Sequence, residues 1–181
     1  MLDTRLDTLV HYVCARCDNP SKLGATKLNK VLWYSDVFAF AQFGKSVTGA
    51  TYIKRQFGPV PRDIVEACAR LQQSGALVQR VGNCNGYAQK QFIALSPADI
   101  SVFSAEQISL VDSILDAICS NHTATSISEL SHDLVWEVAA IGEEIPMAAA
   151  AFGGNVGEID ENDMSWAHNE VDRIERGIVS I

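Results

Sequence analysis

The sequence predicts a mainly helical α+β fold with a small antiparallel sheet or hairpin. Through most of the chain, apolar residues recur at spacings of three and four, which is typical of helices with one buried face. Around residues 77–95, two β-prone runs flank a segment rich in Gly and Asn, which predicts a hairpin. With 181 residues, 48% of them apolar, the chain is long enough to bury the core of one domain.

The first elements are two helices and a strand. We expect the helices over residues 3–17 and 26–43, each with one apolar stripe. Asp18-Asn19-Pro20 should end the first helix, because a residue that precedes proline avoids the helical region. Gly44 is suited to end the second helix. The β-branched and aromatic run Thr51–Phe57 then predicts a short strand.

A Gly-Pro-Val-Pro corner at residues 58–61 follows that strand. We expect a third helix to begin near Pro61, since the missing N–H of proline costs nothing in a first helical turn, and to end at Gly75. The two hairpin strands come next, at residues 77–81 and 91–95, and a long tip joins them.

Two capping boxes predict the next helices. Ser104 with Gln107 starts a fourth helix, and Ser126 with Glu129 starts a fifth that ends at Gly142. The inner face expected for the fifth helix consists of Leu130, Leu134, Val138 and Ile141.

The chain should close with a short helix at residues 146–152, a loop, and a last helix at residues 164–178. We therefore expect one helical domain over residues 1–152, with an acidic loop and a C-terminal helix, residues 153–181, packed on it.

Charge is unevenly distributed along the chain. The net charge is −8, yet residues 1–100 hold 12 Lys+Arg and 7 Asp+Glu (12 − 7 = +5), and residues 101–181 hold 2 and 15 (2 − 15 = −13). A basic N-terminal surface and an acidic C-terminal one could each steer a partner of opposite sign, or the two halves could satisfy each other. No apolar run reaches the ~20 residues needed to span a bilayer.

The sequence contains little that suggests catalysis or metal binding. Five cysteines and no export signal predict reduced thiols in a cytoplasm, and the Cys14–Cys17 pair falls on a buried helical face. A structural zinc site needs four ligands, and the sequence contains no second cysteine pair of this spacing. Ser131, His132 and Asp133 are adjacent, so on a helix they diverge and cannot form a triad. We predict no enzyme, no metal and no cofactor.

Three segments carry a resemblance to a known family. Lys27–Asp36, KLNKVLWYSD, resembles the KLQKLLYFAD helix of the Panacea domain, the SocA-like antitoxin domain found in many phage-associated proteins. Val47–Pro61 is similar to the ITGDTYIAWKYGPVP stretch of that family, and Leu130–Pro146 to its LSHxxxWxxAxxGExIP stretch. Ala50 departs from the acidic residue that is common there, and Met147 departs from Tyr.

The resemblance implies which residues form the scaffold and which bind. The structural signature consists of Lys27, Leu28, Lys30, Trp33, Tyr34, Asp36, Gly58, Pro59, Pro61, His132, Trp136, Gly142 and Pro146. Family members neutralise small protein toxins by direct binding, and one delivers its toxin to a protease, so the resemblance implies a cytoplasmic bacterial antitoxin of a type II toxin-antitoxin system.

Partner contacts are expected from exposed cations, aromatic residues and the hairpin tip. The candidates are Tyr52, Lys54, Arg55, Phe57, Arg62, Asn83, Asn85 and Tyr87. In a protein interface, Arg and Tyr anchors often dominate affinity. The acidic segment at residues 158–163 could cover a basic toxin surface. The alternatives are a winged-helix-like DNA-binding regulator, which the acidic composition disfavours, and a proteolytic adaptor. The sequence leaves homo-oligomerisation open.

Overall fold

The computed structural model describes residues 5–84 and 86–153. Its helices are α1 (Arg5–Arg16), α2 (Pro20–Phe43), α3 (Ile64–Gln73), α4 (Ala105–Asn121), α5 (Ala124–Leu130), α6 (Leu134–Val138) and α7 (Met147–Gly153). Its strands are β1 (Tyr52–Arg55), β2 (Gly58–Pro61), β3 (Leu77–Cys84), β4 (Tyr87–Ala94) and β5 (Glu144–Ile145). The predicted α+β class is confirmed, whereas the helix predicted at residues 164–178 lies outside the described residues. None of the described helices is both long and apolar enough to cross a membrane.

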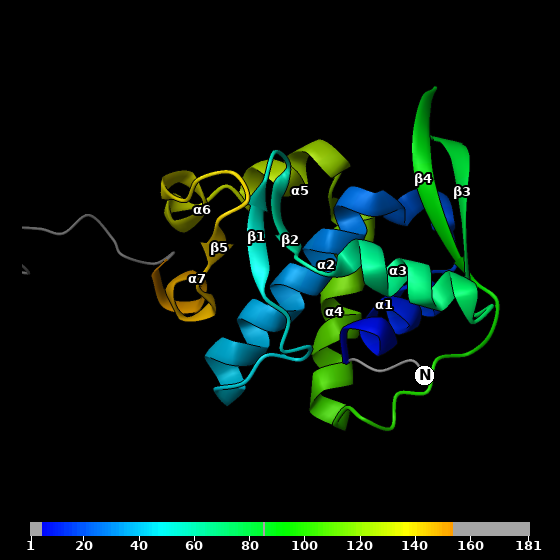
Figure 1. Cartoon of the computed structure of the whole chain (residues 1–181), viewed down its shortest axis with the longest axis horizontal. Coiled ribbons are helices and arrows are strands. Elements are labelled where there is room, and N and C mark those ends of the chain that lie inside the picture. Colours follow the sequence, from blue (N-terminus) through cyan, green and yellow to red (C-terminus); the bar gives the residue numbers. More distant parts are fainter. Residues whose placement is uncertain (1–4, 85, 154–181) are drawn as a thin grey trace, which may run out of the picture.

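Helix α2 runs through the middle of the fold, and most other elements pack on it (Figure 1). One side joins α1, α3, α4 and the β3–β4 hairpin in the larger apolar cluster, to which α2 contributes Leu28, Val31 and Leu32. The other side contributes Trp33 and Val37 to a smaller cluster with residues of β1, β5 and α7. The core is therefore organised around a single helix.

Both ends of α2 are set by short sequence signals. The Asn19 side chain accepts a hydrogen bond from the Ser21 N–H at 3.0 Å, and Pro20 occupies the first helical turn. Gly44 ends the helix with φ 70, and its N–H donates to the Phe40 carbonyl. The helix thus begins earlier than the predicted residue 26, because Asn19-Pro20 both follows α1 and starts α2. At Gly24, which has φ 59 and ψ 172, the helix is kinked.

The Gly-Pro corner forms a strand, which corrects the prediction that Pro61 lies in a first helical turn. Strands β2, β1 and β5 form an antiparallel sheet in that order, with Tyr52 opposite both Pro61 and Ile145. Because β2 is an edge strand, its prolines need not donate to a second neighbour. Helix α3 starts after β2, at Ile64.

The predicted hairpin is confirmed, but its tip is short. Strands β3 and β4 pair antiparallel from Leu77 opposite Ala94 to Cys84 opposite Tyr87. Only two residues therefore join the strands. The long tip predicted from the GNCNG stretch is wrong, because most of that stretch extends the ladder.

The predicted fifth helix is interrupted. Helix α5 starts at a capping box of Thr123 with Ser126, which replaces the predicted Ser126–Glu129 box. The chain then leaves the helix, and the Asp133 carboxylate caps α6 by accepting from the Trp136 N–H at 2.9 Å. The Ser104–Gln107 box of α4 is confirmed, and so is the short helix after Pro146.

A buried carboxylate joins α2 to the three-stranded sheet. Asp36 is fully buried, and its oxygens accept hydrogen bonds from the Thr48 N–H at 2.7 Å, the Thr48 hydroxyl and the Tyr52 hydroxyl at 2.8 Å. Burial raises the pKa of Asp36, and these hydrogen bonds oppose the rise. The Tyr52 ring meets the edge of Trp33 at 4.9 Å between centroids. This network fixes β1 against the middle of α2.

Replacing Asp36 should therefore destabilise the whole fold. We expect Asp36→Ala to lower the free energy of unfolding by about 3 kcal/mol, because it leaves the Thr48 N–H and the Tyr52 hydroxyl buried and unpaired. Urea denaturation measures the difference, with the exposed Glu66→Ala as a control that should stay within about 0.5 kcal/mol of wild type. An Asp36→Ala protein as stable as that control would contradict this role.

Candidate functional site

The β1–β2 turn lies against α5 and α6, and these segments together form one face of the molecule (Figure 1). The Ser128 hydroxyl donates to the Phe57 carbonyl at 2.9 Å, and the Trp136 indole N–H donates to the Arg55 carbonyl at 3.3 Å. The Lys54 amino group donates to the Glu137 carbonyl at 3.1 Å. These bonds between distant parts of the sequence place the turn beside both helices.

Trp136 is the centre of this arrangement. The Lys54 amino group lies 4.1 Å from the centroid of its indole ring, within cation–π range. On the same indole, the His132 ring is stacked at 3.7 Å between centroids, with 5° between the planes. Burial lowers the pKa of His132, and the charges of Lys30 and Lys54 lower it further. These effects favour the neutral form of the His132 ring that stacks on Trp136.

Five large apolar side chains are exposed on these segments. Their exposed fractions are 60% for Phe57, 61% for Leu130, 62% for Leu134, 76% for Val138 and 65% for Ile141. We call this set, which comes from the β1–β2 turn and the α5–α6 region, the turn–helix face. Four of these residues were predicted to form the inner side of a helix, so that prediction is wrong. Soluble monomers rarely expose large apolar patches without a binding role.

Of the contact residues predicted on β1, β2 and the turn between them, some are exposed and one is buried. Tyr52 is only 1% exposed and bonded to Asp36, so its side chain does not reach a partner and that prediction is corrected. Arg55 and Phe57 are exposed beside Trp136, and Lys54 is half-buried on it. Arg62 is exposed but forms an ion pair with Glu144 at 3.2 Å.

The remaining predicted contacts lie at the hairpin tip, away from the turn–helix face (Figure 1). Tyr87 is 78% exposed, and the exposed Asn83 accepts a hydrogen bond from the Gly86 N–H at 2.8 Å. Asn85 lies outside the described residues. The structure therefore does not bring the tip residues together with Lys54, Arg55 and Phe57.

Most of the expected signature residues are buried or half-buried. The buried members are Lys27, Leu28, Lys30, Trp33, Asp36, Gly58, Pro59 and Pro61; Tyr34, His132 and Trp136 are half-buried, and Gly142 and Pro146 are exposed. Lys30 is 1% exposed, and its amino group donates to the Pro59 carbonyl at 3.4 Å. Gly58, at φ 101, lies so close that a Cβ there would collide with the Lys30 amino group and the Ser131 hydroxyl.

The five cysteines are free thiols in the structure. No group of three or more His, Cys, Asp or Glu side chains suited to a metal occurs among residues 5–84 and 86–153. Cys14 is buried, as predicted, and burial raises its pKa. Cys17 is half-buried, and a hydrogen bond from Cys119 of α4 lowers its pKa to about 7. Cys17 thus faces α4 instead of pairing with Cys14.

The described residues form a small, mainly helical α+β domain with an exposed apolar face. The family model described as the SocA-like antitoxin, Panacea domain, matches residues 28–137, and the chain belongs to that family. Comparisons with curated proteins and with solved structures give no match. The matched segment includes α2 from Leu28 onward, the β1–β2 turn, the β3–β4 hairpin, and α5 and α6 up to Glu137.

Adding a single methyl group at Gly58 should disrupt the packing of the β1–β2 turn. Gly58→Ala combines a positive φ with a collision at the buried Lys30, so we expect a loss of about 2 kcal/mol or more in the free energy of unfolding. Gly142→Ala is the matched control, because φ there is 86 but the added Cβ would have open space. Equal losses for the two variants in urea denaturation would show that backbone strain alone is responsible.

Lys30 should make stability depend on pH. Burial lowers its pKa from 10.5 to about 7, so between these values the unfolded chain binds more protons than the folded one. The contribution of Lys30 to stability should therefore rise as pH increases from about 7 to about 10. Urea denaturation at several pH values should show the wild type gaining stability relative to Lys30→Met across that window.

The exposed Lys45→Met variant provides the control for this measurement, because it changes the net charge equally without emptying a buried site. If the difference between wild type and Lys30→Met stays constant across the window, the pKa of Lys30 is not lowered.

Proposed function

We propose that this protein is the antitoxin of a type II toxin-antitoxin system and that it neutralises a protein toxin by binding it directly. Membership of the SocA-like antitoxin family supports the general role. The exposed apolar side chains of the turn–helix face are the observation that favours a protein partner there. The complex would form in a bacterial cytoplasm, and the role of this chain in it is binding, with no catalytic step.

The turn–helix face has the composition of an interface centre with a charged edge. Phe57 and Leu134 would supply apolar contact area, and Trp136 holds Lys54 in place beside them. Arg55 adds an exposed cation. A standard interface of about 800 Å² per partner is compatible with such a surface. The toxin segment that fits it is apolar, with an acidic group placed near Lys54 and Arg55.

A protein partner is favoured over DNA because several cations of the basic half already have partners. Arg70 of α3 forms a two-pronged ion pair with the buried Asp7, with both N–O distances at 2.7 Å. Arg62 is paired with Glu144. A DNA-binding surface needs cations that are available to phosphates.

Delivery of the toxin to a protease is the other alternative. It would use the same contact between the two proteins and would differ only in the fate of the toxin. The half-life of the toxin in cells, measured with and without this protein, would distinguish the two.

The proposal is tested by placing charge on the turn–helix face. We expect the double variant Leu134→Asp, Val138→Asp to lose most co-purification with the product of the adjacent toxin gene, and to lose protection of growth, because burying carboxylates in an apolar interface is costly. The control is Val65→Asp, since Val65 is 72% exposed on α3, outside this face. It should bind and protect as the wild type does.

Thermal unfolding establishes that both variants are folded before binding is compared. A folded double variant that still captures and neutralises the toxin at wild-type levels would remove the turn–helix face from the mechanism. Failure of the wild type itself to bind the neighbouring gene product would contradict the antitoxin proposal.

A further inference from the structure

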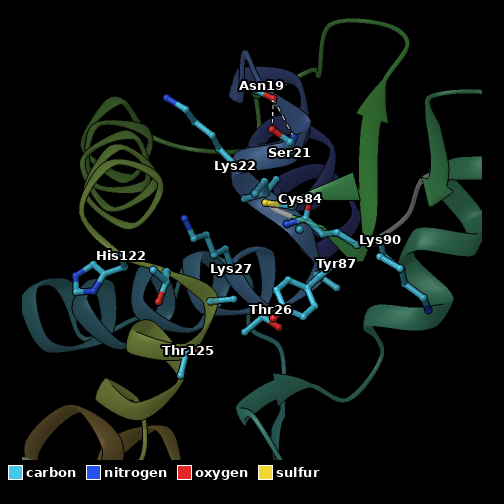
Figure 2. Close-up of a pocket in the computed structure, with 17 residues that line it drawn as sticks. Asn19, Ser21, Lys22, Thr26, Lys27, Cys84, Tyr87, Lys90, His122 and Thr125 are labelled. Atoms are coloured by element: carbon cyan, nitrogen blue, oxygen red, sulfur yellow. Dashed lines mark hydrogen bonds between the residues drawn. The ribbon is translucent and has the colours of Figure 1, made fainter. Parts of the chain in front are cut away.

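A second feature is a cavity of about 870 Å³ at the other end of α2 (Figure 2). The first turns of α2, the tip half of the β3–β4 hairpin and the connection from α4 to α5 enclose it. These segments contribute residues 19 and 21–27, residues 84 and 87–90, and residues 122–125. The volume falls in the range of ~300–1,000 Å³ that is typical of small-molecule sites.

The lining of this cavity is cationic, although the protein carries a net charge of −8. Lys22, Lys27, Lys90 and His122 line it, and no Asp or Glu is among the described lining residues. Within residues 5–84 and 86–153, the three lysines form no ion pair and no side-chain hydrogen bond. A concave site lined by one sign of charge focuses the field and concentrates counter-ions. The cavity therefore favours an anion.

Lys27 is the cavity residue that is best placed to bind such a ligand. Its side chain is only 9% exposed, yet it lacks a partner in the described part of the chain. Figure 2 shows its amino group pointing into the space between the hairpin and the α4–α5 connection. The Lys27 amino group is not among the buried unpaired polar atoms of the described residues, so it opens onto the cavity, where an anion can reach it.

The backbone at this point favours the same ligand charge. Gly24 has non-helical angles, so a new helical run starts at Ala25 and continues to Phe43. The first N–H groups of a helix lack partners within it and carry partial positive charge, which favours an anion such as phosphate. Lys27 lies in that first turn. The amino group and the helix start therefore act on one region of the cavity.

The uncharged part of the lining is suited to an aromatic ring and hydroxyl groups. Tyr87, whose ring lies in the middle of Figure 2, is 78% exposed and offers a stacking surface. Thr26 and Thr125 add hydroxyl groups. Stacking on an aromatic side chain is a common way to hold a nucleobase without reading its identity.

We propose that this cavity binds a nucleoside phosphate, with a phosphate at Lys27 and the start of the helical run, and the base against Tyr87. Lys22 attracts the charged ligand, whereas the Lys90 amino group points away toward α3 (Figure 2). This site is separate from the turn–helix face, and its ligand binding does not depend on the presence of a toxin.

Isothermal titration calorimetry on the full chain tests the proposal with ATP, AMP, inorganic phosphate and adenosine as probes. We expect the nucleotides to bind more tightly than inorganic phosphate and adenosine. Lys27→Met, which keeps most of the side-chain volume, should weaken nucleotide binding roughly tenfold or more. Tyr87→Ala should weaken nucleotide binding and leave phosphate binding unchanged. Lys45→Met, an exposed lysine outside the cavity, should bind as the wild type does.

Circular dichroism and thermal unfolding show whether Lys27→Met is folded. If it is not, the rim variant Lys22→Met replaces it, and a loss of nucleotide affinity is again expected. The proposal is overturned if the wild type binds none of the phosphate probes, if a folded Lys27→Met or the rim variant retains full affinity, or if adenosine binds as tightly as ATP. Binding of a short RNA that ATP does not displace would also overturn it.

Discussion

The buried Asp36 carboxylate holds the fold together at the point where its two halves meet. It lies in the middle of α2 and bonds the Thr48 backbone and the Tyr52 side chain, so the first strand of the three-stranded sheet is fixed to the central helix. Strands β2 and β5 pair with β1 on either side, and β5 leads into α7, which packs on α2. The β1–β2 turn is itself hydrogen-bonded to α5 and α6. The turn–helix face therefore depends on one desolvated acid, which is tolerable because its oxygens accept hydrogen bonds from Thr48 and Tyr52.

Local signals in the sequence were sufficient for much of the fold. Helical spacing predicted α1, spacing and a capping box predicted α4, and two β-prone runs predicted the β3–β4 hairpin. The strand β2 was missed, because Pro59 and Pro61 suggest a helix start or a turn when read alone. Only the sheet order shows that these prolines lie on an edge, where a missing N–H is not needed. The pairing of β2 with β1 therefore determines that this segment is a strand.

The functional surfaces could be predicted less well, for a physical reason. The apolar spacing of Leu130, Leu134 and Val138 shows only that such residues would share a side of a helix; whether that side is covered depends on segments far away in sequence. Here the chain leaves the helix after α5, and these side chains remain exposed. Lys27 and Lys30 pose the same problem. They are three residues apart on one helix, yet one donates to the Pro59 carbonyl and the other faces a cavity. No periodic pattern separates the two.

The contacts of individual cations show how the positive charge of the N-terminal half is distributed in the fold. Much of the positive charge of the N-terminal half is used internally: Lys30 is buried against Pro59, Lys54 lies on Trp136, and Arg70 is paired with Asp7. A uniform basic surface is therefore not what the sequence encodes. Lys22 and Lys27 instead share one concave site without an acid in its described lining. Since exposed charges are screened within about 10 Å at moderate salt, the local grouping of these lysines matters more to a ligand than the net charge of −8. An acidic protein can thus offer an anion a favourable site.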